Sequence, residues 1–164
     1  MQDKRCTLYN VIFPLWLVLF APLFPLVYLP VLLVNLVIDA GVIGAALRLL
    51  KFSLPGGALR SYIFKAWLCG FLADFLGVAI LFALADSSLM APDSILTIWN
   101  NPTTVVLHLL TIALVGALIY LANRRLGTRA GLPAAVAHKV ALAMGIITAP
   151  WVFLVPTSIV PFLN

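Results

Sequence analysis

The chain has very little charge for its length of 164 residues. Asp, Glu, Lys and Arg together make up 9% of it, whereas a soluble domain carries about 25%. Apolar residues make up 64% of the chain, and its mean hydropathy is +1.17. This composition excludes an ordinary soluble domain and predicts one integral membrane domain over residues 1–164.

Cysteine and known chemical motifs are also scarce. Cys6 and Cys69 show no CxxC spacing, so we expect two free thiols. The sequence holds no glycine-rich phosphate loop, no HExxH motif, no GxSxG nucleophile elbow and no Cys/His cluster with metal-ligand spacing. We therefore expect neither a cofactor nor a metal site.

The charge that is present is mostly positive, with a net charge of +5 and a pI near 9.6. In a soluble protein this balance would suggest nucleic-acid binding. Here the basic residues lie at the ends of apolar runs, as the positive-inside rule predicts for membrane proteins. We expect the lipid bilayer, and not nucleic acid, to be the partner.

The apolar runs predict an all-α membrane protein, a polytopic bundle of about five transmembrane helices. The run over 11–50 is too long for one crossing, which needs about 20 residues, and prolines interrupt its first half. We expect a short, proline-broken first helix and a proline-rich turn over 22–30. Asn101 followed by Pro102 predicts the capped beginning of the fourth helix. The predicted helices cover residues 8–21, 31–50, 61–85, 102–122 and 137–156.

Loop charges predict the orientation. The loops near 51–60 and 123–136 are basic, whereas the loop over 86–102 holds Asp86 and Asp93 and no base. The positive-inside rule places both basic loops in the cytoplasm. Lys4 and Arg5 place the N-terminus there as well, so five crossings of the plasma membrane leave the C-terminus outside.

Two aspartates within apolar runs, Asp39 and Asp74, are the main functional candidates. A carboxylate in hydrocarbon costs several kcal/mol unless it is compensated, so such residues are functional candidates by default. Asp39 precedes Arg48 by nine residues, and Asp74 follows Lys65 by nine. At about 1.5 Å per residue both lie roughly 13–14 Å from the cytoplasmic boundary, where neighbouring helices would bring them together.

Other residues support a polar site around this pair. Asn35 shares a helix face with Asp39, and Gly70 and Gly77 lie on the face of Asp74, where they allow close approach of a neighbouring helix. His108 lies nearer to the outside, where it relays protons or bonds a neighbouring helix. The candidate proton- or ion-binding set is Asn35, Asp39, Asp74 and His108. The alternative is that the aspartic acids are hydrogen-bonded between helices as packing groups.

The fifth predicted helix carries a ridge of small residues, one at every fourth position. Such a ridge is a packing surface, either within the bundle or between subunits. Its members are Ala137, Ala141, Gly145 and Ala149.

These features lead to three functional hypotheses. The first is a small proton- or cation-dependent transporter or channel-like protein that uses the Asp39/Asp74 pair. The alternative is a non-catalytic membrane-embedded subunit or scaffold that docks through the fifth helix or the segment over 14–30. The third is an intramembrane aspartyl enzyme. Because five helices leave a narrow path, the first two hypotheses predict a homo-oligomer or a membrane-protein partner.

Overall fold

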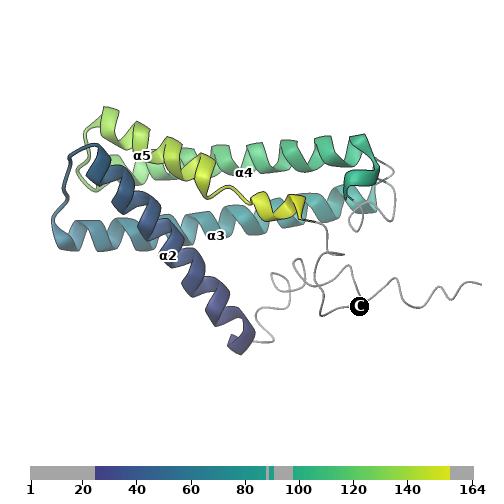
Figure 1. The fold of residues 1–164 in the computed structure, drawn as a ribbon, viewed down its shortest axis with the longest axis horizontal. Coiled ribbons are helices and arrows are strands. Elements are labelled where there is room, and N and C mark those ends of the chain that lie inside the picture. Colours follow the sequence, from purple (N-terminus) through teal and green to yellow (C-terminus); the bar gives the residue numbers. More distant parts are fainter. Residues whose placement is uncertain (1–24, 88, 91–97, 156–164) are drawn as a thin grey trace, which may run out of the picture.

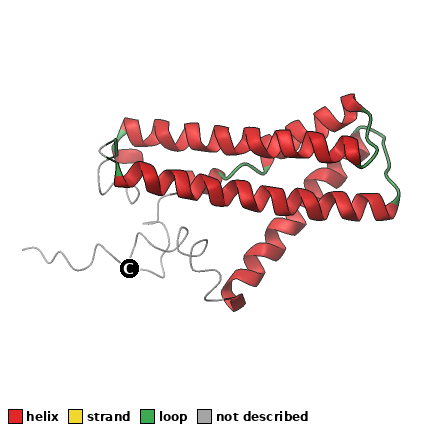
Figure 2. Ribbon diagram, turned by 180° about the vertical axis from the view of Figure 1, so that it is seen from behind, coloured by secondary structure: helices red, strands yellow, loops and turns green. Residues whose placement is uncertain are grey.

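The computed structural model describes residues 25–87, 89–90 and 98–155. This part of the chain is helical and contains no strand (Figure 2). Four of its helical segments are long and apolar enough to cross a membrane. The elements are α2 (Pro25–Leu49), α3 (Gly56–Asp86), the short 3-10 helix η2 (Ile98–Asn100), α4 (Pro102–Arg129), α5 (Ala134–Ile147) and the 3-10 helix η3 (Trp151–Leu154) (Figure 1).

The described part therefore holds four candidate crossings where the sequence predicts five, and the predicted helix over 8–21 lies outside it. The predicted turn over 22–30 is wrong from Pro25 onward, because α2 begins there and includes Pro30. Proline suits the first position of a helix, where no intrahelical N–H bond is needed. Pro30 removes one bond near the beginning of α2, a loss that membrane helices tolerate.

The predicted beginning of the fourth helix is confirmed, whereas the predicted end of the fifth helix is wrong. The Asn101 side chain accepts a hydrogen bond of 2.9 Å from the Thr103 N–H, with Pro102 as the first helical residue. The fifth predicted helix over 137–156 is instead interrupted: α5 ends at Ile147, and η3 follows a break at 148–150. Pro150 explains the break, because it has no N–H to donate to the carbonyl of Ile146.

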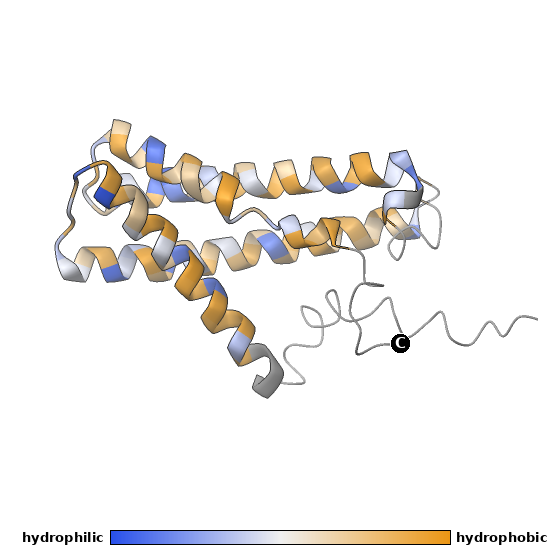
Figure 3. Cartoon of the chain, viewed as in Figure 1, coloured by the Kyte–Doolittle hydropathy of each residue, from blue (hydrophilic) through white to orange (hydrophobic). Residues whose placement is uncertain are grey.

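α3, α4 and α5 run side by side, and α2 crosses them obliquely, so that its first half leaves the bundle (Figure 1). Most residues along the helices are hydrophobic (orange in Figure 3), and many of the large ones are exposed. On α2, for example, Val37 is 70% exposed and Leu33 is 58% exposed. In water such a surface would be costly, whereas in lipid it is the expected exterior.

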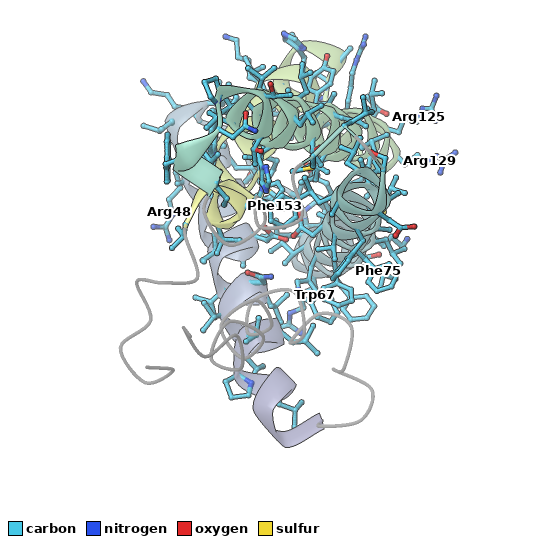
Figure 4. All side chains as sticks on the ribbon, turned by 90° about the vertical axis from the view of Figure 1, so that its right-hand side faces the viewer. Arg48, Trp67, Phe75, Arg125, Arg129 and Phe153 are labelled. Carbon is cyan, nitrogen blue, oxygen red and sulfur yellow. The ribbon has the colours of Figure 1, made fainter. Side chains whose placement is uncertain are left out.

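Positive charge gathers at one end of the bundle, at or near the α2–α3 and α4–α5 connections. Arg125 and Arg129 point away from the bundle in the view along its axis (Figure 4). Asp86 lies at the opposite end of α3. The Lys and Arg residues of the described part are all exposed: Arg48, Lys51, Arg60, Lys65, Arg124, Arg125, Arg129 and Lys139.

The α4–α5 contact is the tightest in the bundle. A Cβ atom added to Gly116 would lie 2.6 Å from the carbonyl oxygen of Gly145. One added to Gly145 would lie 2.7 Å from the carbonyl oxygen of Gly116, so the two backbones touch. Ala137 and Ala141 are completely buried, and Ala149 is 8% exposed. The ridge of small residues therefore packs within the chain, against α4.

A buried polar link joins α3 to α4 near the basic end. The hydroxyl of Tyr62 donates to Oδ1 of Asn123 at 3.3 Å, and Nδ2 of Asn123 donates to the carbonyl of Ile119 at 3.0 Å. Because both side chains are buried, these bonds compensate for their loss of water.

Candidate functional site

A cavity of about 480 Å³ lies between α2, α3 and the break that separates α5 from η3. Its polar lining comes from all three parts of the chain. Asn35 and Asp39 come from α2, Asp74 comes from α3, and Thr148 comes from the break. The remaining lining is apolar or aromatic, and its other polar groups are the indole N–H groups of Trp67 and Trp151.

The two aspartates approach the cavity from different helices. Asp39 is 7% exposed, and its Oδ2 lies 3.7 Å from the position that a Cβ on Gly70 would occupy. The carboxylate of Asp39 therefore lies against α3 beside Gly70. Asp74 follows Gly70 by one helical turn, and its Oδ1 is buried without a hydrogen-bond partner in the described part of the chain. The structure thus brings Asn35, Asp39 and Asp74 to one cavity.

This arrangement concentrates negative charge. Two neighbouring carboxylates in a low-dielectric environment do not both ionise unless positive charge accompanies them. No Lys or Arg is among the residues that line the cavity in the described part. A proton on one carboxyl group or a cation in the cavity would supply such a compensating charge.

The break after α5 also lines this cavity, and its own groups satisfy several of the carbonyls freed there. The Thr148 hydroxyl donates to the Met144 carbonyl at 2.8 Å, and the Trp151 indole N–H donates to the Ile146 carbonyl at 2.7 Å. The backbone N–H of Trp151 donates to the carbonyl of Ala149 at 2.7 Å. In a continued helix it would donate to the carbonyl of Ile147 instead. Ile147 and Thr148 line the cavity, so the negative end of the α5 dipole lies beside the aspartates.

Contacts with α3 and with Trp99 fix the position of η3 after this break. A Cβ added to Gly77 would lie 3.0 Å from Cε2 of Phe153, so the ring of Phe153 rests directly on α3. The indole N–H of Trp99 donates to the Leu154 carbonyl at 3.1 Å. In the view along the bundle, Phe153 points between the helices (Figure 4). Gly77 therefore allows α3 to pack closely against Val115 of α4 and Phe153 of η3, and it does not line the cavity.

The fourth predicted site residue lies elsewhere. His108 is 2% exposed on α4, and its Nδ1 lies 2.9 Å from the Thr104 carbonyl of the preceding turn. It does not line the cavity. α4 packs against α3, α5, η2 and η3. The structure therefore does not bring His108 to the aspartate pair.

Sequence reasoning missed the aromatic wall of the cavity. Trp67, Phe71 and Phe75 recur at every fourth position of α3 and all line the cavity, and this spacing was the available signal. The indole N–H of Trp67 donates to the Leu32 carbonyl of α2 at 3.2 Å. Trp151 and Phe153 complete the wall from the other side, and Pro150 was the signal for the break that places them there.

The described residues contain no group of three or more His, Cys, Asp and Glu side chains able to hold a metal ion. Comparison with protein-family models, with curated proteins and with solved structures finds no match for this chain. The fold and the site therefore define only a class: an all-helical protein with four helices suited to crossing a membrane.

Proposed function

We propose that the protein is a small membrane transporter or channel-like protein in which Asp39 and Asp74 bind a proton or a cation. The observation that carries the proposal is the cavity that both carboxylates share, with no basic residue in its described lining. A site of this kind attracts positive charge and repels negative charge.

Two features favour transport over a purely structural role for the pair. An aspartic acid that served as packing would be hydrogen-bonded, yet Oδ1 of Asp74 is buried without a partner beside an open cavity. The discontinuity between α5 and η3 is the second feature. In secondary transporters, substrate and ion sites are formed at interrupted helices, and here residues of the break over 148–150 line the same cavity as the aspartates.

The scaffold alternative depends on a free docking surface. Of its two candidates, the ridge on the fifth helix is occupied by α4 of the same chain, and the segment over 14–30 lies mostly outside the described residues. No separate observation favours an aspartyl enzyme. We therefore place ion or proton transport first.

The proposed orientation puts the basic end of the bundle in the cytoplasm of a cell membrane. In a variant without Cys6 and Cys69, single cysteines at Gly56 and Thr128 are expected to resist a membrane-impermeant thiol reagent in intact cells. A cysteine at the exposed Leu89, at the opposite end, is expected to react. All three should react after permeabilisation, and labelling of position 56 or 128 from outside would contradict the orientation.

Flux through purified protein in liposomes tests the proposed function. With a pH gradient and a dye inside that reports pH, protein-containing vesicles are expected to take up or release protons faster than empty vesicles. The flux should depend on the cations present, because proton and cation use one site. Identical rates in protein-containing and empty vesicles under every cation gradient would contradict the proposal.

A further inference from the structure

The cavity is much larger than an inorganic ion. Its volume is about 480 Å³, whereas one water molecule in the liquid occupies about 30 Å³. Sites for small organic molecules have volumes of roughly 300–1,000 Å³ and are mainly apolar and aromatic, with a few polar groups. The cavity matches this description, so its size indicates an organic ligand.

The lining also restricts the charge of that ligand. Asp39 and Asp74 are negative groups, and the described lining holds no Lys or Arg to balance them. Aromatic faces attract cations as well, Trp most strongly. Five aromatic side chains surround the carboxylates: Trp67, Phe71, Phe75, Trp151 and Phe153. Both kinds of group favour a positive ligand.

Most hydrogen-bond donors of the described lining are already used by the protein, and the side-chain amide of Asn35 is the exception. The indole N–H of Trp67 is bonded to Leu32, and that of Trp151 is bonded to Ile146. The hydroxyl of Thr148 is bonded to Met144. These groups have no proton left for a ligand carboxylate or phosphate. With the Asn35 amide as its remaining donor and no Lys or Arg in the described lining, the cavity would bind an anion poorly beside two carboxyl groups.

We propose that the cavity binds a monovalent organic cation with an aromatic or otherwise apolar body, with Asp39 and Asp74 as its counter-charge. The proposal rests on the proposed function, since it names the cation that this site takes. The apolar body would lie against the aromatic side chains, and the positive centre beside the carboxylates. The first half of α2, which crosses the bundle obliquely (Figure 1), contributes Val31 and Asn35 to the lining.

Competition binding to the purified protein in detergent tests the proposal without requiring transport. Labelled tetraphenylphosphonium is expected to bind and to be displaced by the unlabelled compound. Tetraphenylborate has the same shape and the opposite charge, and tetramethylammonium has the charge without the aromatic body. Each is expected to compete at least about tenfold less well, because one lacks the attraction to the carboxylates and the other lacks the apolar contact.

Asp39→Asn and Asp74→Asn are each expected to weaken tetraphenylphosphonium binding at least about tenfold. Asp86→Asn removes an exposed charge outside the cavity and should leave the binding unchanged. Equal competition by tetraphenylborate, or undiminished binding in both cavity variants, would overturn the proposal. Aspartate-dependent proton flux without tetraphenylphosphonium binding would overturn the organic-cation proposal alone. Specific binding without any flux would support the ligand class and contradict the transport function.

Discussion

Proteoliposomes that contain Asp39→Asn or Asp74→Asn are expected to lose their proton- or cation-dependent flux by at least about tenfold, which corresponds to about 1.4 kcal/mol in the barrier. Asparagine keeps the volume of aspartate and most of its hydrogen bonding, but it neither titrates nor carries charge. The cavity has no other acidic side chain in its described lining. Loss of either carboxyl group therefore removes one of the two groups that can hold the proton or bind the cation.

The matched control for these variants is Asp86→Asn. Asp86 is exposed at the last position of α3 and does not line the cavity. Its variant should transport like the wild type, and all three variants should insert and show thermal transitions close to that of the wild type. Wild-type flux in both Asp39→Asn and Asp74→Asn would remove the pair from the transport mechanism. The scaffold hypothesis would then become the better explanation.

Gly145→Leu is expected to prevent normal folding. Even a Cβ atom at this position would lie 2.7 Å from the carbonyl oxygen of Gly116 and 3.0 Å from Cβ of Tyr120. The carbonyl belongs to the backbone of α4, so it does not move aside as the end of a side chain would. Overpacking costs roughly 1–3 kcal/mol or more, and a leucine here should reach at least the upper part of that range. The measurement is the thermal transition and the monodispersity of the protein in detergent.

Gly41→Leu is the control for a leucine introduced into a membrane helix. Gly41 is exposed on α2, and a Cβ atom there would meet nothing within 4 Å. Its replacement should leave the transition temperature close to that of the wild type, since leucine also forms helix better than glycine. If Gly145→Leu has the same transition temperature as Gly41→Leu and the wild type, the close α4–α5 contact does not exist in the folded protein.

The break between α5 and η3 is a feature that sequence reasoning did not predict, since it expected one helix over 137–156. Pro150 was visible, but a proline within an apolar run either kinks a helix or ends it, and the local sequence does not decide between them. The opposite error occurred at Pro30, which was expected to lie in a turn and lies within α2. In both cases the decision depends on whether neighbouring groups satisfy the freed carbonyls, as the Trp151 indole does for Ile146.

The sequence by itself determined the class of the protein, the approximate positions of four apolar helices, the capped beginning at Asn101 and the basic ends of the bundle. These properties depend on composition and on residues close together in the chain. It also placed Asp39 and Asp74 at one depth, because a helix rises by a fixed distance per residue.

Only the tertiary structure decided which side of each helix faces the cavity. A membrane helix is apolar all round, since lipid and neighbouring helices both accept apolar side chains, so its periodicity does not reveal its inner face. For this reason the aromatic wall of Trp67, Phe71 and Phe75 was missed, and His108 was grouped with aspartates that it does not approach. The rotation and crossing of the packed helices join Asn35, Asp39 and Asp74 to the break after α5, and only long-range packing fixes these angles.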